Sequence, residues 1–536
     1  MRTSDPVDSF VLPWRSFVEF FAGVRLDDRD HLTELASDGS RTTWSRAEWH
    51  DYVMAVATDL RNRGIETGDC VASLCGNRAE AIALAFGCWV VGACYVPLNV
   101  AESVDRILFI VGDADVRVLI HDPTYIDLVE QIRSQSAVVI DLPVARTSRV
   151  SDADCAELAA RAPSLQTAAL RVYTLGTTGT PKGVILTAQN LLTDCDAMYR
   201  VLEWAEETRI LTVLPVHHVN GLVISNLLPW FAGYSTVLCD RFRSDRFWSD
   251  IESEQATVCS MVPTLLEFLL EAGTADVPEH FQEVLCGAGP LMPETVAAFE
   301  YTFKVPVRHL YGLSETTAVA TLMGRMATDK RLAWYCDHGY PSIGAALPHV
   351  EVAVADASGG LLGPAERGEL VIRGATVMRE YAGRAAETAV AMQGGWFHSG
   401  DQGFWLPDDN GVPYYFVTGR IKELIIRGGV NLSPFQIDEV LSSHPSVRFG
   451  LAIGFENRYY GEEVAAYVVA DRPVNEREIL DYCSERLDFA HRPKVVVFGQ
   501  EVPFTATGKA KRLALMESLS DELSRYRDHQ FKRSEA

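Results

Sequence analysis

The sequence has few of the features that mark a protein held together by cross-links or by bound metal. Its eleven cysteines are an odd number, lie scattered from Cys70 to Cys483, and form no C-x-x-C pair. This spacing argues against both a disulfide framework and a structural zinc site. We therefore expect a chain that stays reduced, and the cytoplasm is the simplest location for it.

Basic residues are scarce as well. The 48 lysines and arginines stand against 72 aspartates and glutamates, which gives a net charge of −24. Nucleic acids and anionic membranes attract proteins through a concentrated basic face. We therefore expect no nucleic-acid partner, and an anionic substrate would have to be held by local positive groups.

The chain also has little that predicts export or membrane insertion. Its first residues, Met1 to Pro6, lack the apolar core of a signal peptide. Residues 81–98 are uncharged and just long enough to be considered as a membrane span. Their glycines, small residues and closing Y-V-P-L instead favour a buried helix that runs into a short strand, so we expect no membrane span.

Length and apolar pattern predict more than one domain of the α/β class. A chain of 536 residues, 48% hydrophobic and 22% charged, is a soluble globular protein too long for one ordinary core. Helical and strand patterns alternate over residues 12–162, which indicates a largely parallel α/β sheet. Residues 142–166 are typical of a solvated connection, and residues 350–380 of an antiparallel or barrel-like subdomain. The last part, from residue 420, combines short strands with helices.

The stretch at residues 173–183 reads Y-T-L-G-T-T-G-T-P-K-G and lies between two apolar runs, which predicts strand, loop and strand. Its three glycines let the backbone turn tightly and bring N–H groups to a ligand. Its threonines supply hydroxyl donors, and Lys182 supplies a mobile positive charge. This mixture suits a polyphosphate, although composition alone fits a flexible hairpin equally well.

The loop is not a Walker A loop. That motif places Lys directly after its last Gly and a hydroxyl residue next, whereas here Gly179 is followed by Thr180, Pro181 and Lys182. The usual P-loop fold is therefore not expected.

A second candidate segment follows the strand pattern of residues 210–214. It contains His217 and His218 before a Gly-containing turn, and the end of a strand is where α/β folds place ligands. Two histidines could bind a metal, but no third ligand lies at useful spacing. A structural hydrogen-bonding role is the favoured interpretation.

Two later turns suit a nucleotide. Gly287-Ala288-Gly289 follows one strand pattern, and Tyr311 to Thr316 follows the next. Small residues let a flat ring approach the backbone, and Tyr311 offers a stacking face. Glu315 is a natural Mg²⁺ ligand, because that ion takes one or two carboxylates plus phosphate oxygens. The alternative is that Tyr311 is a core residue and Glu315 a helix cap.

Two charged residues near position 410 complete this nucleotide hypothesis. The carboxylate of Asp401 can accept hydrogen bonds from both hydroxyls of a ribose, and Arg420 can bridge ribose and phosphate. Either residue alone could instead belong to a surface ion pair.

Together these segments resemble the adenylate-forming superfamily, which includes acyl- and aryl-CoA synthetases, peptide-synthetase adenylation domains and beetle luciferases. The glycine loop resembles its signature loop, residues 311–315 match Y-G-x-[ST]-E, and residues 503–509 match P-x-T-x-x-G-K. The class I acyl-CoA synthetases are the most similar group. One departure is Leu175, where the family usually has a small polar residue, so this loop has one hydroxyl fewer.

The resemblance implies a two-domain architecture. Residues 1–419 would form a large N-terminal domain of α/β subdomains with a β-barrel-like subdomain, and residues 420–536 a small mobile α+β domain. Lys422 would be the hinge between two poses of the small domain. Gly428 and Gly429 would line the tunnel for a thiol in one pose, and Lys509 would enter the site in the other.

The resemblance also implies the site residues. The catalytic residues would be Lys509, Glu315 and Lys182, with Glu315 as the metal ligand. The ATP-binding set would be Thr174, Gly176, Thr177, Thr178, Gly179, Lys182, Gly287, Ala288, Tyr311, Gly312, Ser314, Asp401, Arg420 and Lys509. The substrate pocket would be lined by His218, Val219, Asn220, Gly221, Gly287, Gly312 and Leu313.

The implied reaction joins a small-molecule carboxylic acid to AMP, releases pyrophosphate, and passes the acyl group to a thiol. Its cofactors would be ATP, Mg²⁺ and coenzyme A, with a carrier protein as the alternative acceptor. The chain shows no Asp near His218 to hold an α-ammonium group, which favours an acid without an α-amine.

Three other hypotheses stay open on the sequence. A natural-product enzyme of this fold could load a carrier protein, form an amide, or use nitrite to diazotise an aromatic amine. A nucleotide-binding module without catalysis is disfavoured by Glu315 and Lys509, and luciferase-like oxidation has no independent signal.

Overall fold

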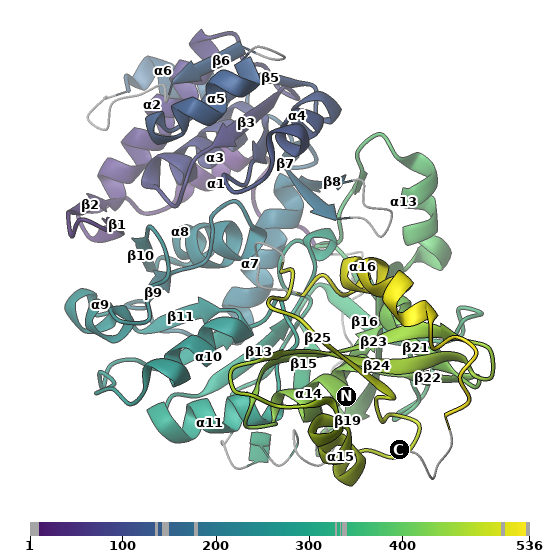
Figure 1. Cartoon of the computed structure of the whole chain (residues 1–536). Helices are drawn as coiled ribbons and strands as arrows, with labels where there is room; N and C mark the ends of the chain where they lie inside the picture. Colours follow the sequence, from purple (N-terminus) through teal and green to yellow (C-terminus); the bar gives the residue numbers. More distant parts are fainter. Residues whose placement is uncertain are drawn as a thin grey trace.

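The computed structural model describes residues 10–133, 138–141, 150–175, 181–326, 330–332, 334, 340–504 and 510–531. In these residues the strands form three sheets, of seven, thirteen and five strands (Figure 1). The first two sheets use the chain up to Arg420, and the third uses the chain after it. The expected α/β class is confirmed.

The seven-stranded sheet has the order β18-β8-β7-β4-β3-β5-β6. The run from β7 to β6 is parallel, whereas β7 pairs antiparallel with β8 across the glycine loop and β8 pairs antiparallel with β18. The strands are β3 (Cys70–Leu74), β4 (Cys94–Pro97), β5 (Val116–His121), β6 (Val138–Asp141), β7 (Ala168–Leu175), β8 (Pro181–Thr187) and β18 (Glu380–Tyr381). The predicted strand on each side of the glycine loop is therefore present.

The uncharged run at residues 81–98 forms a buried helix and a strand, as expected. Helix α3 (Ala79–Val91) is buried along its length and ends at Gly92, whose φ of 82° places it in the left-handed region that glycine adopts without strain. Helix α2 (Arg46–Asn62) packs so closely on α3 that a Cβ on Gly87 would lie 2.7 Å from the Cγ1 of Val56. None of the described helices is long and apolar enough to cross a bilayer.

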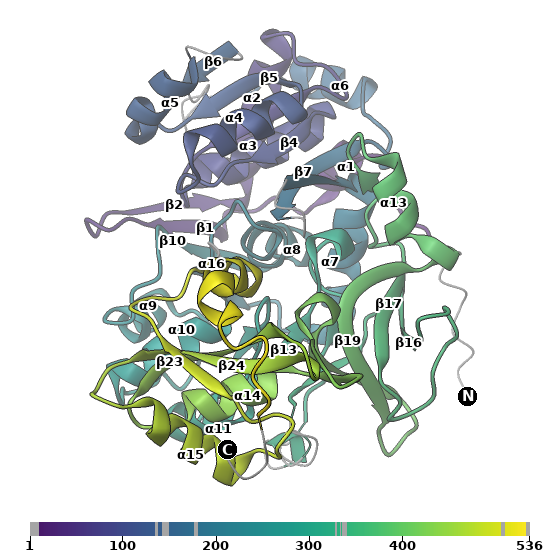
Figure 2. The same ribbon diagram turned by 45° about the vertical axis from the view of Figure 1, so that its right-hand side comes forward.

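The thirteen-stranded sheet changes character along its order, β16-β17-β19-β20-β15-β14-β13-β12-β11-β9-β10-β1-β2. From β1 to β13 the neighbours run parallel, and from β13 to β16 they run antiparallel. The antiparallel part confirms the pattern predicted for residues 350–380, and Figure 2 shows β17 and β19 as long curved strands near α13 (Ala385–Ala391). The sheet thus joins the parallel core to the antiparallel subdomain.

The strands of this sheet have the following bounds: β1 (Asp30–Leu35), β2 (Arg41–Ser45), β9 (Arg209–Thr212), β10 (Ser235–Cys239), β11 (Val258–Met261), β12 (Glu283–Cys286), β13 (Val307–Tyr311), β14 (Thr321–Leu322), β15 (Ser342–Ala346), β16 (Val350–Ala355), β17 (Gly368–Gly374), β19 (Phe397–Pro407) and β20 (Pro413–Arg420). The other helices of this part are α1 (Phe17–Gly23), α4 (Val104–Asp113), α5 (Ile126–Arg133), α6 (Asp152–Ala160), α7 (Ala188–Leu202), α8 (Leu228–Ala232), α9 (Phe247–Glu254), α10 (Pro263–Ala272) and α11 (Pro293–Phe303).

The five-stranded sheet carries helices on both faces. Its strands are β21 (Ile425–Arg427), β22 (Val430–Leu432), β23 (Val447–Asn457), β24 (Gly461–Ala470) and β25 (Val495–Phe498). Along β24, Val464 and Ala466 pack with α14 (Pro434–Ser442) and α15 (Glu476–Arg486), whereas Ala465 and Tyr467 pack with α16 (Arg512–Ser524). This alternation is the two-residue period of a strand that is buried on both faces.

The connection expected at residues 142–166 is more structured than its composition indicated. Helix α6 forms within it, because Ser151 accepts a hydrogen bond from the backbone N–H of Asp154 at the helix start and Leu158 is buried against the core. A cap and one apolar anchor were enough to order a segment that is otherwise polar.

Candidate active site

The glycine loop joins β7 to β8, and its central residues, Gly176, Thr177, Thr178 and Gly179, lie outside the described residues. On its flanks Thr174 pairs with Lys182 across the two strands. The ammonium of Lys182 lies 3.2 Å from a carboxylate oxygen of Glu387 and 5.1 Å from the ring centre of Tyr381. The lysine is therefore held by α13 and β18, two elements that no sequence pattern connected to it.

Two of the predicted glycines stand where the backbone approaches too closely for a side chain. A Cβ on Gly287 would lie 2.6 Å from the carbonyl oxygen of Leu310, and one on Gly312 would lie 2.1 Å from that of Ala318. Between them, Ala288 has a φ of 61°, a left-handed conformation that is uncommon outside glycine. The ends of β12 and β13 thus form a closely packed backbone surface.

Tyr311, Asp401 and Arg420 come together beside this surface. The Tyr311 hydroxyl donates to one carboxylate oxygen of Asp401 at 2.7 Å, and the Arg420 Nε lies 3.2 Å from the other. Asp401 and Arg420 face each other across β19 and β20, so strand pairing fixes their separation. Asp401 is 5% exposed. Its charge raises the pKa of Arg420, and burial together with that charge raises the pKa of Tyr311 well above its usual range.

Glu315 is fixed from two sides. It lies in the short turn Ser314–Thr316 after β13, where its side chain accepts a hydrogen bond from the Tyr381 hydroxyl at 2.9 Å. Its backbone oxygen accepts the N–H of Met378 at 2.7 Å. Burial and the Glu315 charge raise the pKa of Tyr381 above its usual range, so this phenol remains a donor. Leu313, predicted as pocket wall, precedes the turn and packs against the main core.

A single buried carboxylate of this kind fits a Mg²⁺ ion that also takes phosphate oxygens. Among the described residues no group of three or more His, Cys, Asp or Glu side chains is arranged to hold a metal by itself. Glu315 therefore fits the role of the one protein carboxylate in a site whose other ligands would be phosphate oxygens.

The segment with the two histidines is held by Asn77. Its side chain donates to the carbonyl oxygens of Leu214 and Cys239 at 3.0 and 3.2 Å and accepts the N–H of Val216 at 2.9 Å. The rings of His217 and His218 lie 4.4 Å apart, and burial, with His218 nearby, lowers the pKa of His217 well below its usual range. Among the described residues the Nε2 of His217 has no hydrogen-bond partner, so the hydrogen-bonding role expected for the two histidines is not seen at this atom.

The predicted pocket wall continues as a π-helix, Asn220–Leu227, directly after Val219. Asn220 accepts a hydrogen bond from Ser260 at 2.8 Å, and a Cβ on Gly221 would lie 2.3 Å from the carbonyl oxygen of Pro215. π-helical turns are rare and occur often at functional sites. This geometry is compatible with a pocket wall, and no sequence pattern predicts a π-helix here.

Of the residues predicted in the C-terminal part, Arg420 belongs to the cluster with Asp401. Lys422 lies exposed in the short turn Ile421–Glu423, directly between β20 and β21. Gly428 and Gly429 form the tip of the β21–β22 hairpin with φ of 60° and 83°, and a Cβ on Gly429 would meet nothing within 4 Å. Lys509 lies outside the described residues.

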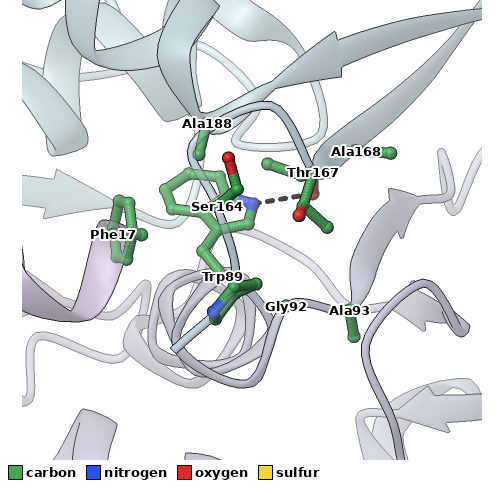
Figure 3. Close-up of a pocket in the computed structure, with 10 residues that line it drawn as sticks. Phe17, Trp89, Gly92, Ala93, Ser164, Thr167, Ala168 and Ala188 are labelled. Carbon is green, nitrogen blue, oxygen red and sulfur yellow. Dashed lines mark hydrogen bonds between the residues drawn. The ribbon is translucent and has the colours of Figure 1, made fainter. Parts of the chain in front are cut away.

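Two cavities elsewhere do not involve the predicted site. The one in Figure 3, about 10 Å³ in volume, surrounds Trp89, whose indole N–H donates to the carbonyl oxygen of Ala169 at 2.8 Å. A larger one, about 510 Å³, lies beside β14 and β15 and is lined in part by His349 and Tyr414. The first is too small for a substrate, and neither contains a residue predicted to bind ATP.

Tyr381 and Glu387, which contact Glu315 and Lys182, belong to no motif that predicts a functional site. Their only local signal is aromatic and acidic character in an otherwise ordinary segment. They reach the site because β18 pairs with β8, with Tyr381 opposite Val184. A strand of two residues gives no periodicity from which this pairing could be predicted.

Known proteins of similar sequence share these segments. Residues 24–382 match the family model described as AMP-binding enzyme, and residues 436–509 match that of the AMP-binding enzyme C-terminal domain. An oxalate–CoA ligase of Arabidopsis thaliana is 30% identical over 487 residues, which are 87% of this chain and 92% of that protein.

Solved structures of several proteins are similar in fold to this chain over nearly its whole length. The ATP-bound structure of MatB from Rhodopseudomonas palustris is 26% identical with a TM-score of 0.81, covering 94% of this chain and 99% of that one. The o-succinylbenzoate coenzyme A synthetase of Bacillus subtilis, in complex with ATP and magnesium, is 28% identical with a TM-score of 0.79 and the same coverage. The amide bond synthetase McbA of Marinactinospora thermotolerans is 25% identical, also with a TM-score of 0.79 and that coverage.

Proposed function

Since the chain belongs to the AMP-binding enzyme family, we propose that it activates a carboxylic acid with ATP and transfers the acyl group to coenzyme A. In the first half-reaction a carboxylate oxygen bonds to the α-phosphorus, the bond from that phosphorus to the bridging oxygen breaks, and pyrophosphate leaves. In the second, the thiol sulfur bonds to the acyl carbon, its proton is lost, and AMP leaves.

The observation that carries this proposal is the cluster of Tyr311, Asp401 and Arg420 beside Glu315. A carboxylate that is already oriented by a tyrosine and an arginine can accept both ribose hydroxyls, and the arginine can also reach phosphate. Gly287 and Gly312 carry no side chain, so an adenine ring would approach the backbone directly there. The remaining ATP contacts would come from Thr174, Ala288, Ser314 and the glycine loop.

The chemical step is mainly an electrostatic problem. Two unit charges 4 Å apart repel by about 4 kcal/mol at an effective dielectric constant near 20, and a cation that touches both reactants reverses the sign. We assign that role to Lys509, with Lys182 receiving charge on the departing pyrophosphate. Mg²⁺ held by Glu315 would neutralise phosphate charge. No general base is needed, because the carboxylate is already ionised.

We also propose that the small domain begins at Arg420 and rotates about Lys422. What supports this boundary is that β20 ends at Arg420 and that β21, which belongs to a different sheet, begins five residues later at Ile425. After rotation, Gly428 and Gly429 would admit the thiol in place of Lys509. The large domain would then span residues 1–419 and the small domain residues 420–536.

The acyl group would lie against His218, Val219, Asn220 and Gly221. The sequence has no Asp near His218 to hold an α-ammonium group, which favours an acid without an α-amine. The identity of the acid is the finer question that a substrate screen must answer.

The test is pyrophosphate release from ATP with a panel of short-chain, aryl and fatty acids, each with and without coenzyme A. We expect release that depends on one class of acid and a thioester that forms only when coenzyme A is present. Absence of acid-dependent pyrophosphate release across the whole panel, from protein that binds ATP, would contradict the proposal.

One second candidate, amide formation, is favoured by the likeness to the amide bond synthetase McbA. In that case an amine would take the place of the thiol after the same acyl-adenylate has formed. Adding a panel of amines or a carrier protein in place of coenzyme A separates the acceptors, because the amide, the carrier-bound thioester and the free thioester differ in mass.

A further inference from the structure

One residue of the Glu315 turn has a strained backbone. Thr317 has φ of 69° and ψ of −77°, which is the rare form of the γ-turn. Its side chain is β-branched, and such residues are genuine outliers at positive φ. Thr317 is also completely buried, so it lies in the interior of the fold rather than on a loose loop. Strain of this kind persists only where surrounding contacts hold it in place.

The first such contact ties Thr317 to the segment that also holds Glu315. The Thr317 hydroxyl donates to the carbonyl oxygen of Thr376 at 2.7 Å. Two residues further along that segment, Met378 donates its N–H to the backbone oxygen of Glu315. Tyr381 then donates its hydroxyl to the Glu315 carboxylate. The turn and the carboxylate are therefore fixed to one stretch of backbone, residues 376–381.

The second contact comes from Asp194 on helix α7, on the other side of the strained residue. Asp194 is completely buried, and one of its carboxyl oxygens accepts the backbone N–H of Val319 at 3.3 Å. Val319 and Ala318 form the wall against which Gly312 packs, since a Cβ on Gly312 would lie 3.0 Å from the Cα of Val319. Asp194 therefore holds the backbone that forms one side of the expected adenine surface.

Helix α7 connects the two contacts. Asn190 lies one helical turn before Asp194 and on the same face, as residues four apart do. Its side-chain amide donates to the carbonyl oxygens of Ala375 and Val377 at 2.8 and 3.0 Å. The helix thus holds the backbone on both sides of the Glu315 turn. Burial raises the pKa of Asp194 well above its usual range.

We propose that Thr317 and Asp194 are positioning residues that hold Glu315 and the backbone at Gly312 in one fixed relation. The strained turn lets the chain reverse within two residues, so that the carboxylate for Mg²⁺ and the surface for adenine are presented to one nucleotide. The inference rests on the proposed ATP-dependent function. Thr317 and Asp194 would contact neither ATP nor the acid. They would instead fix the positions of Glu315 and Gly312, which would contact the nucleotide and its metal ion.

Thr317→Gly is the sharpest test, because glycine adopts this backbone conformation without strain but lacks the hydroxyl that binds Thr376. We expect a thermal unfolding midpoint within a few degrees of the parent protein. We also expect the ATP KM or the Mg²⁺ concentration for half-maximal pyrophosphate release to rise, up to roughly 100-fold, the scale of a 1 Å misplacement. Thr317→Ser is the matched control, since it keeps the hydroxyl. Its ATP KM and its Mg²⁺ dependence should be close to those of the parent protein.

A folded Thr317→Gly variant with unchanged ATP and Mg²⁺ dependence would overturn the proposal. A fall in stability alone, with unchanged kinetics for the folded fraction, would show a merely structural role and would overturn it too. The parent enzyme is measured first. If it releases no pyrophosphate with any acid, the proposed function fails, and that result is distinct from failure of the positioning role.

Asp194 gives a second, independent measurement should Thr317→Gly not fold. Asp194→Asn keeps an acceptor oxygen for Val319 and should keep the ATP KM of the parent protein, whereas Asp194→Leu keeps the branched shape, with a larger volume, and removes the acceptor. We expect Asp194→Leu to raise the ATP KM by roughly 2- to 10-fold, the range of one lost hydrogen bond. Asp196→Asn is the control on the same helix, because Asp196 pairs with His349 and Arg200 instead. Equal ATP KM values for the Asn and Leu variants would contradict the role of Asp194.

Discussion

The two sides of the proposed ATP site differ in how their charges are paired. On the nucleoside side, Asp401 is bound by Tyr311 and Arg420, and all three lie on strands of one sheet. On the phosphate side, Lys182 is paired with Glu387, whose side chain is 42% exposed. The second expected cation, Lys509, lies near the far end of the chain, outside the described residues.

This difference separates binding from chemistry. The nucleoside side has its polar groups oriented before ATP arrives, so little rearrangement is needed there on binding. In the proposed mechanism the phosphate side exchanges partners, because Lys182 would leave or share Glu387 and the small domain would deliver Lys509. Changes on the first side should therefore alter the ATP KM, and changes on the second should alter the individual half-reactions.

The largest effect is expected from Lys509→Ala. Removing one charged group that stabilises the transition state should lower adenylate formation by roughly 10² to 10³ fold or more. Transfer from a supplied acyl-adenylate to coenzyme A should be retained, because the small domain has then rotated Lys509 away. Adenylate formation is measured by pyrophosphate release, and transfer to coenzyme A is measured separately by thioester formation from the supplied acyl-adenylate.

Lys511→Ala is the matched control for this variant, since Lys511 is exposed two residues further along. It should leave both half-reactions unchanged. If Lys509→Ala reduced both half-reactions equally, the assignment of this lysine to one pose would be wrong, and the contrast between the two sides would lose its main support.

Asp401→Asn tests the nucleoside side. The amide keeps the shape of the side chain but leaves Arg420 without its counter-charge and weakens the acceptor for ribose. Hydrogen bonds to charged groups contribute about 1.5–3 kcal/mol, so the ATP KM should rise by roughly 10- to 100-fold. The rate at saturating ATP should change much less. Asp409→Asn, at an exposed carboxylate paired with Lys330, is the control. A large loss of kcat with unchanged KM would contradict the separation of binding from chemistry.

The sequence was informative where local pattern determines structure. The uncharged run at residues 81–98 folds as a buried helix and strand because small and apolar residues suit only the interior. Tyr311 and Arg420 lie at the ends of β13 and β20, whereas Asp401 lies within β19. The family resemblance predicted that these three residues share one site, because spacing alone does not show which strands are neighbours.

The rest depends on contacts between distant segments. Tyr381 reaches Glu315 through a two-residue strand added to β8, and Asp194 reaches Val319 from the middle of a helix. Neither contact leaves a periodic signal, because each involves one side chain and one backbone or carboxylate group. The strain at Thr317 is likewise set by tertiary packing, since nothing in the letters S-E-T-T predicts a positive φ.

A smaller effect is expected from Lys422→Pro, which tests whether the phosphate side is completed by rotation of the small domain. Proline fixes φ near −65° and removes the freedom that a hinge needs. Adenylate formation should be retained, and thioester formation should fall several-fold in single-turnover measurements. Lys422→Ala keeps the backbone free and serves as the control. Unchanged thioester formation in the proline variant would contradict the hinge.

The smallest effect is expected from Glu387→Gln, which removes the partner that holds Lys182 in the structure. Exposed ion pairs contribute about 0–1 kcal/mol, so the ATP KM should fall by no more than roughly 5-fold as Lys182 becomes available to phosphate. The effect should shrink at high salt, because the competing pair is partly exposed and therefore screened. Glu380→Gln, next to Tyr381 and paired with Arg379, is the control. A rise in the ATP KM would mean that Glu387 orients Lys182 toward the phosphates instead of competing with them, and the phosphate side would then be as well organised before binding as the nucleoside side.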